Sequence, residues 1–221
     1  AIRDYDCGAT KDRYYFHDLD ASALPAPWTG VSPGTHLPAT QAREFANKTA
    51  PASPTATDIT VNITDDSELE LSHFYMDPPL DRPAGFSIAG TVDMQAYMSK
   101  NAGGKVNIIC YLYDYNPNTG ESIQIGTQAA DSGAGLRDNF LLTFSITPTG
   151  IVREGNILMW RFTTQRSSSY VGPVTFHYDS SATTGTQAGL SYGDVCFAPL
   201  SITMNKTVDK LEASAGQTLA Y

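Results

Sequence analysis

Basic residues are scarce in this chain, which has 14 Lys and Arg against 23 Asp and Glu and a formal net charge of −9 at pH 7. Binding to nucleic acid depends largely on pairing of Lys and Arg with phosphates. We therefore expect no nucleic-acid partner. Charged residues make up only 17% of the chain, so Thr, Ser, Asn and Gln supply most of its polarity.

Long apolar runs are also missing. No segment approaches the roughly 18 consecutive apolar residues that a membrane-spanning helix requires, and we expect no membrane insertion. The sequence opens at Ala1 directly into polar residues, as a chain does after removal of a signal peptide or after trimming. We predict a secreted protein, located extracellularly or at the cell surface.

The chain contains only three cysteines, which permit at most one internal disulfide and leave one thiol over. Cys110 falls on the inward face of a predicted strand, so we expect a small, buried apolar side chain. Cys7 and Cys196 lie near the chain ends, which often meet in a sandwich. If a disulfide forms, we predict that it joins Cys7 to Cys196.

Alternation of apolar and polar residues is abundant, and it is clearest between residues 105 and 126. Val106, Ile108, Cys110 and Leu112 point to one side of a strand, and Tyr111, Tyr113 and Tyr115 to the other. The segment 116–120, Asn-Pro-Asn-Thr-Gly, is a typical turn. These features predict a central β-hairpin that is covered on both faces.

Similar alternation recurs at 13–19, 59–63, 69–73, 86–98 as one long stripe through Gly90, 140–146, 157–162, 174–178 and 195–204. Six prolines between residues 21 and 57 exclude a long helix or a central strand there, and only 41–47 could form a helical turn. We predict an all-β fold, a β-sandwich of jelly-roll type, with a long Pro-rich wrapping arm at 21–57. The sandwich domain would span 1–204, and 205–221 would be a linker, the start of an Ig-like repeat or a donated strand.

Motifs for catalysis are absent. There is no G-x-S-x-G elbow, no conspicuous Ser or Cys beside a His, and no closely spaced histidine pair. Glu68 and Glu70 project onto one strand face, where we expect solvent rather than a glycosidase site. We predict no catalytic residues and no enzyme, and we expect His17 and His177 to be hydrogen-bonded strand residues. The last of three functional hypotheses, after the two given below, is a hydrolase whose catalytic triad is assembled only by the fold.

Carboxylates gather in turns, which suits calcium in extracellular sandwiches. The candidate ligands are Asp65, Asp66 and Asp179, with solvated turns as the alternative, and calcium is the only cofactor that the sequence suggests. Three sequons make Asn47, Asn62 and Asn205 potential glycosylation sites in a cell that glycosylates secreted proteins. The tyrosines of 111–115 with Trp28 could stack on a sugar, although packing beneath the arm is the preferred interpretation.

Two stretches resemble known families. Asp77-Pro78-Pro79-Leu80, the 86–92 strand, the 105–115 strand and the segment 176–181, Phe-His-Tyr-Asp-Ser-Ser, are similar to jelly-roll modules of secreted bacterial and archaeal surface proteins. A related jelly roll is the non-catalytic C-terminal domain of X-Pro dipeptidyl-peptidase-like hydrolases. The segments 206–210 and 216–221 resemble the opening of the Ig-like repeat of such surface proteins.

These resemblances imply a modular, secreted, non-enzymatic context. The first hypothesis is a structural or adhesive subunit of an extracellular surface protein or filament, whose partners are copies of itself or adjacent domains. Polymerisation by donor-strand exchange would use 205–221 as the donor. The alternative is a carbohydrate-binding module of a secreted protein, whose partner is a glycan.

Overall fold

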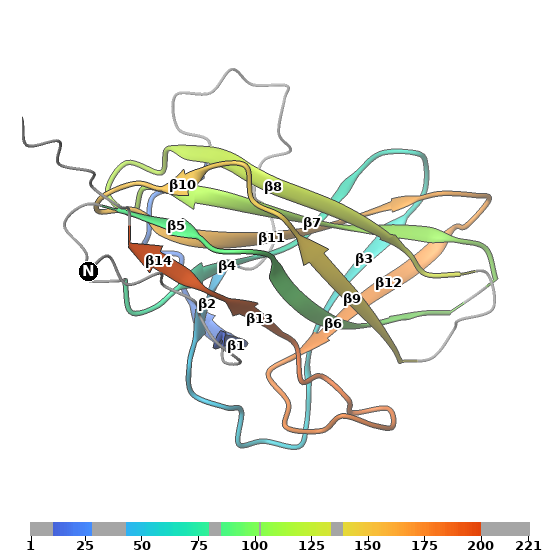
Figure 1. Cartoon of the computed structure of the whole chain (residues 1–221). Helices are drawn as coiled ribbons and strands as arrows, with labels where there is room; N and C mark the ends of the chain where they lie inside the picture. The colour runs from blue at the N-terminus through green and yellow to red at the C-terminus, as the bar shows by residue number, and fades with distance from the viewer. Residues whose placement is uncertain (1–10, 28–42, 80–84, 102, 134–138, 200–221) are drawn as a thin grey trace, which may run out of the picture.

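The computed structural model describes residues 11–27, 43–79, 85–101, 103–133 and 139–199, and these form an all-β structure (Figure 1). No helix long and apolar enough to span a membrane occurs in these ranges. The prediction of an all-β fold is confirmed. The strands are β1 (Asp12–Asp20), β2 (Arg43–Asn47), β3 (Thr57–Ile63), β4 (Leu69–Met76), β5 (Phe86–Ile88), β6 (Val92–Lys100), β7 (Val106–Tyr115), β8 (Ser122–Asp131), β9 (Phe140–Ile146), β10 (Ile151–Val152), β11 (Ile157–Arg166), β12 (Gly172–Tyr178), β13 (Tyr192–Val195) and β14 (Phe197–Pro199).

The main sheet has the order β3-β12-β6-β13-β1-β2-β4-β11-β7-β8, with β9 on the second edge of β6. One edge of β6 therefore pairs with β9, and the other is shared by β13 and β12. Backbone and side-chain bonds also link β9 and its following turn to β8, such as Thr149 N to Ile125 O at 2.7 Å. The sheet thus folds back on itself, with β4, β11, β7 and β8 in one layer and β6, β9 and β13 in the other (Figure 1).

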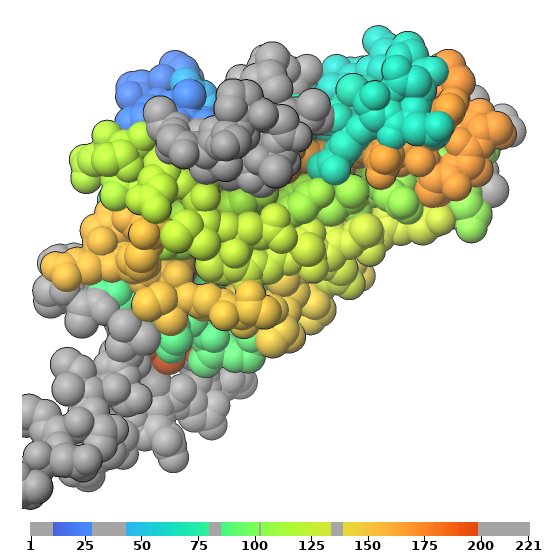
Figure 2. Space-filling model, turned by 90° about the horizontal axis from the view of Figure 1, so that it is seen from above, coloured from blue at the N-terminus to red at the C-terminus, as the bar shows by residue number. Residues whose placement is uncertain are grey.

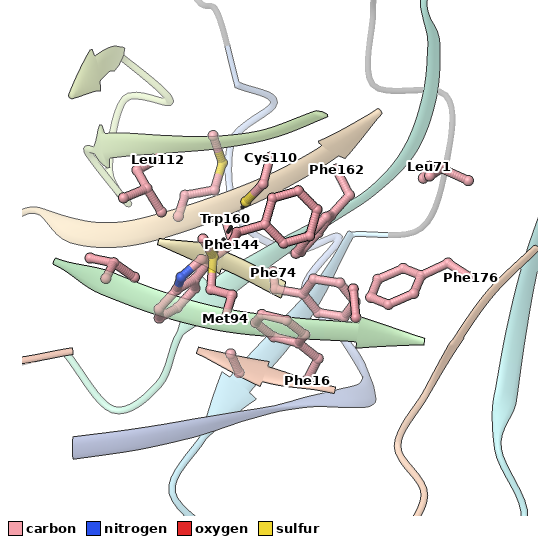
Figure 3. Close-up of a cluster of buried hydrophobic side chains, with 14 of the residues drawn as sticks. Phe16, Leu71, Phe74, Met94, Cys110, Leu112, Phe144, Trp160, Phe162 and Phe176 are labelled. Atoms are coloured by element: carbon pink, nitrogen blue, oxygen red, sulfur yellow. Dashed lines mark hydrogen bonds between the residues drawn. The ribbon is translucent and has the colours of Figure 1, made fainter. Parts of the chain in front are cut away.

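An aromatic-rich core fills the space between the layers (Figure 3). Phe16 stacks on Phe74 with ring centroids 4.4 Å apart, and Phe162 contacts Phe176 at 5.0 Å. Cys110 is a buried free thiol with its Sγ 3.4 Å from Met94 Sδ, as expected. This one core includes bulky inward residues of the central strands, namely Val92, Ile108, Leu142, Phe144 and Trp160.

The predicted hairpin is present as β7 and β8, and its register runs from Asn107↔Asp131 to Tyr115↔Ser122. Tyr113 and Tyr115, on the side facing away from Leu112, are fully buried. Tyr115 Oη donates to Pro25 O at 2.7 Å, and its ring packs on Tyr75. The start of the arm therefore contacts this face, and these two rings are not open to a sugar. Trp28 lies outside the described residues.

The expectation that the arm holds no central strand, and at most a helical turn at 41–47, is wrong. β2 runs parallel to β4 and lies between β1 and β4 inside the main sheet. Its buried side chains are Glu44 and Ala46, whereas Phe45 is only half-buried. A strand with its carboxylate inside and its aromatic residue partly outside gives no apolar alternation to detect.

The long stripe from Phe86 to Met98 is also not one strand. It divides into β5 and β6, which belong to different sheets, with Gly90 between them at φ +69°. A left-handed glycine redirects the chain without breaking its alternation. β5 forms a small sheet with β10 and β14, and Pro199 lies on β14 at an edge of that sheet among the described strands.

Candidate functional site

The outer face of β6 carries a row of polar side chains and borders two pockets. Val92, Met94, Ala96 and Met98 point into the core, so Asp93, Gln95, Tyr97 and Ser99 point away from it. We call these four residues the β6 polar strip. At about 3.3 Å per residue, Asp93 and Ser99 lie roughly 20 Å apart.

The segment 180–191 folds over the middle of the strip and divides it. Tyr97 Oη donates to Thr183 O at 3.0 Å, and Gln95 Nε2 donates to Leu190 O at 2.6 Å. Asn139 Nδ2 donates to Ala188 O at 2.6 Å from the β9 side. Two open pockets remain, one at each end of the strip.

The Asp93 pocket has a volume of about 390 Å³, and its walls come from four strands that are far apart in sequence. Its side chains include two carboxylates, two carboxamides, two aliphatic hydroxyls and the aromatic rings of Phe144 and Tyr192. Volumes of about 300–1,000 Å³ are usual for small-molecule sites. The lining residues are Asp93, Met94, Gln95, Gln128, Thr143, Phe144, Ser145, Tyr192 and Asp194.

Both carboxylates of the Asp93 pocket are paired with basic side chains. These are Lys11, just before β1, and Arg13, within β1. Lys11 Nζ lies 2.5 Å from Asp93 Oδ2, and Arg13 holds Asp194 through two bonds of 2.8 Å. Partial burial raises the pKa of Asp93, but hydrogen bonds from Lys11, Ser145 and Thr91 outweigh it and lower the pKa below its ordinary value. The pocket is therefore polar but close to neutral in charge.

Tyr192 is the partly exposed aromatic residue of this pocket, whereas Phe144 is buried, and the neighbours of Tyr192 fix its ring. The Arg13 guanidinium carbon lies 3.6 Å from the ring centroid, and Tyr15 meets the ring edge-on at 6.0 Å. Burial chiefly raises the pKa of Tyr192, so the hydroxyl is protonated at neutral pH. A fixed aromatic ring beside amides and hydroxyls suits a ligand with both C–H and O–H groups.

The Ser99 pocket, at the other end of the strip, has a volume of about 300 Å³. Inside it Ser99 Oγ lies 2.7 Å from His177 Nε2, and His177 Nδ1 lies 2.6 Å from Asp58 Oδ1. The hydroxyl, the imidazole and the carboxylate come from β6, β12 and β3. His177 is thus a hydrogen-bonded strand residue, as predicted, but its two partners could not be predicted from the sequence.

The candidate calcium ligands lie in two different places. Asp65 accepts from Ser67 N at 2.8 Å and Asp66 pairs with Arg166, whereas Asp179 accepts from His17 Nδ1 at 2.7 Å and from Asp18 N. His17 is also bonded to Thr49 O, as a structural strand histidine would be. No group of three or more His, Cys, Asp or Glu side chains placed to hold a metal occurs in the described part of the chain.

Of the potential glycosylation sites, Asn62 is exposed on β3, and Asn47 is half-buried with its Oδ1 accepting from Thr49 N at 2.8 Å. Asn205 lies outside the described residues. Cys196 is disulfide-bonded. Cys7 lies outside the described ranges, so its pairing with Cys196 stays a prediction.

The expectation of solvent around Glu70 is wrong. Glu70 is buried, and Arg161 donates to both of its oxygens at 2.7–3.1 Å, with His73 Nε2 3.0 Å away. Burial raises the pKa of Glu70 above its ordinary value, against the effect of Arg161. Glu68 instead accepts from Tyr111 Oη at 2.9 Å. Because Glu70 and Arg161 are buried, we assign this pair a structural role.

Comparisons with known proteins identify the fold but no family. No protein-family model matches the chain, and no curated protein matches it significantly in sequence. An α-amino acid ester hydrolase matches 86% of this chain over 36% of its own, with a TM-score of 0.51 and 10% identity. A CocE/NonD family hydrolase from Staphylococcus aureus (84% and 36%, TM-score 0.49, 8% identity) and the infectious bursal disease virus VP2 particle (78% and 45%, TM-score 0.30, 14% identity) are more distant in shape.

The chain spans about a third of the length of these hydrolases. At 10% identity the similarity to the ester hydrolase shows the fold alone. The two matches with TM-scores below 0.5 add nothing to that conclusion. The class defined by fold is therefore a β-sandwich of the kind found in such hydrolases, in agreement with the resemblance to their C-terminal jelly roll. Secretion and an Ig-like repeat do not follow from these matches.

Proposed function

We propose that the chain is a binding module of a larger extracellular protein and that the Asp93 pocket binds a neutral saccharide. The observation that carries this proposal is the gathering of amides, hydroxyls and one oriented tyrosine in a pocket whose charges are already paired. A free ion would have to compete with Lys11 or Arg13 for its contacts. A neutral ligand with several hydroxyls would not.

Two residues would make the main contacts. Gln128 Oε1 accepts from Ser145 N at 2.6 Å, so the amide nitrogen Nε2 is the end of the side chain that is available to donate to a ligand. Tyr192 would offer the ring face opposite Arg13 to sugar C–H groups. Loss of one neutral hydrogen bond costs about 0.5–1.5 kcal/mol, or roughly 2- to 13-fold in affinity.

The test is a glycan array followed by affinity electrophoresis in soluble polysaccharides. We expect retention by at least one glycan, and loss of that retention in Tyr192→Ala and Gln128→Ala. Gln124→Ala is the matched control, because Gln124 is exposed on the same strand outside the pocket. No retention on any glycan, or equal retention by all variants, would disprove the proposal.

A structural or adhesive subunit that polymerises remains the second proposal, and one observation favours it. β3 lies at the end of the main sheet and pairs with β12 along one edge, and no described strand pairs with its other edge. An open edge of this kind accepts an added strand. The expected donor, 205–221, lies outside the described residues.

Deletion of 205–221 tests this second proposal. A donor-strand polymer should become monomeric, because head-to-tail exchange builds an open filament that depends on the tail. Light scattering and electron microscopy of the full and shortened chains would report the change. An unchanged assembly state would exclude tail donation.

A further inference from the structure

We propose that Ser99, His177 and Asp58 form a nucleophilic site that hydrolyses small, neutral carboxylic esters. This inference goes beyond saccharide binding and concerns the other end of the β6 polar strip. It would also overturn the expectation from the sequence that the chain has no catalytic residues.

The hydrogen bonds run in the order that such a site needs. A carboxylate only accepts, so His177 Nδ1 carries a proton and donates it to Asp58 Oδ1 at 2.6 Å. His177 Nε2 is then the basic nitrogen, and it accepts from Ser99 Oγ at 2.7 Å. This is the relation of nucleophile, base and orienting acid that activates a serine.

The strand register explains how three distant residues meet. Thr175 lies opposite Ser99, and His177 lies two positions further along β12, so Ser99 and His177 share one face of the sheet. Asp58 lies directly opposite His177 on the other side of β12. Residues at such direct and diagonal positions are within reach of each other's side chains.

Burial places the base in a protected position while the nucleophile stays accessible. His177 is 7% exposed, Ser99 is half-buried on the pocket wall, and the Asp58 side chain is 54% exposed at the edge. Ser99 and Asp58 could each be satisfied by water. Neither therefore needs the imidazole in order to avoid an unpaired buried group.

The pocket beside Ser99 also carries a side-chain amide. Tyr170 Oη donates to Pro173 O and lies 3.2 Å from Asn101 Oδ1. The Nδ2 group of Asn101 would be the donor offered to an oxyanion in this pocket. Gly172, at φ +143°, makes room for the contact between Asn101 and Tyr170. A Cβ at Gly172 would lie 2.7 Å from Asn101 Oδ1.

The lining selects a small and uncharged substrate. Asn101, Asn139, Pro173, Thr175 and Thr186 are neutral, and the ammonium group of the one lining lysine, Lys100, donates to Gly104 O at 2.8 Å. The pocket is open and about 300 Å³ in volume. An ester fits better than an amide, because its alkoxide leaves with less assistance from an acid.

The reaction proceeds in two balanced steps. Ser99 Oγ bonds to the carbonyl carbon as its proton passes to His177 Nε2, and the ester C–O bond then breaks as that proton passes to the leaving alkoxide. Water next adds to the acyl-serine and gives a proton to His177. The acyl C–O bond to Ser99 breaks, the proton returns to Oγ, and the carboxylic acid departs.

The first test is covalent labelling with a fluorophosphonate, located by mass spectrometry of peptides. We expect the adduct on Ser99, with no label at this position in His177→Gln, which keeps the fold but lacks the base. Ser87→Ala is the matched control. Ser87 is also a partly buried strand serine that donates to a carbonyl, but it lies in the small sheet.

The second test is the hydrolysis of 4-nitrophenyl butyrate. Because general-base catalysis contributes about 10²–10⁴-fold, His177→Gln should lower kcat/KM at least about 100-fold. Ser99→Ala should reduce the rate to that of buffer, and Ser87→Ala should match the wild type. Circular dichroism would establish that each variant is folded. The proposal fails if Ser99 is not labelled, or if Ser99→Ala hydrolyses the ester as fast as the wild type.

Discussion

Leu141 and Leu142 are neighbours on β9 that face opposite ways, and they allow the strand register to be tested. Leu142 is 8% exposed and belongs to the core, whereas Leu141 is 44% exposed. We expect Leu142→Ala to lower the free energy of unfolding by about 2–5 kcal/mol, through lost burial and a residual cavity. Chemical denaturation would measure it.

Leu141→Ala is the control, and we expect a change within about 0.5 kcal/mol. Equal losses from the two variants would contradict the register of β9 against β6, in which Leu142 lies opposite Ala96.

Glu44 is a buried carboxyl that accepts from Tyr178 and forms no ion pair among the described residues, and it makes stability depend on pH. Burial, with the charges of Asp18, Asp179 and Asp20, raises its pKa from 4.5 to about 7, although the hydrogen bond from Tyr178 acts against this shift. Folding therefore favours the protonated form. Its contribution is fully present below about pH 4.5 and is lost as the pH rises through about 7.

We expect Glu44→Gln to remove this dependence, because glutamine keeps an acceptor for Tyr178 and cannot ionise. Relative to the variant, the wild type should lose on the order of 1–3 kcal/mol of unfolding free energy between pH 4.5 and pH 8. Glu154→Gln, at an exposed turn position, should follow the wild type. Parallel pH profiles for wild type and Glu44→Gln would contradict the assignment.

At the scale of elements, β13 approaches β11 closely because position 193 has no side chain. A Cβ at Gly193 would lie 2.9 Å from Trp160 Nε1 and 3.1 Å from Cε2. We expect Gly193→Ala to displace the indole and cost about 1–3 kcal/mol. The measurement is the melting temperature together with Trp160 fluorescence in a Trp28→Phe background. An unchanged melting temperature and emission maximum would show that β13 packs differently.

Elements that the sequence predicted well are those in which one face is apolar. β9 follows the alternation of its residues, because it buries Phe140, Leu142, Phe144 and Ile146 on one face. β8 does not, because a register shift opposite Leu112 and Tyr113 leaves Ile123 exposed while Ile125 is buried. β2 could not be predicted, since Glu44 is inside and Phe45 only half-buried. Gly90 hides the break between β5 and β6 because the alternation continues across it.

The Asp93 pocket and the Ser99 pocket could not be predicted from the sequence for a related reason. Asp58, Ser99 and His177 are up to 119 residues apart in the chain, and only the pairing of β3 with β12 and of β12 with β6 brings them together. The pairing order of strands depends on the whole fold rather than on local spacing. The sequence could identify His177 as a strand residue, but it could not name the residues beside it.

At the scale of the whole molecule, the calcium hypothesis has a direct test. A site that binds calcium only in the folded state raises the melting temperature by mass action. The hypothesis predicts a higher melting temperature in millimolar calcium than in chelator, with Asp65→Asn, Asp66→Asn and Asp179→Asn as variants that would locate the site. Equal melting temperatures in the two buffers would remove the hypothesis.

The pairing of β1 with β13 determines how the molecule would respond to a pulling force. The strands are antiparallel with Asp12 opposite Val195, so the chain enters β1 and leaves β13 at the same end of the pair. Tension applied through the two chain ends would break the hydrogen bonds of this ladder one after another, in an unzipping geometry that offers little mechanical resistance. The disulfide at Cys196 lies one residue beyond that end. If Cys7 is its partner, the disulfide would bear the tension before the β1–β13 ladder separates. A reducing agent would then sharply lower the unfolding force in single-molecule pulling.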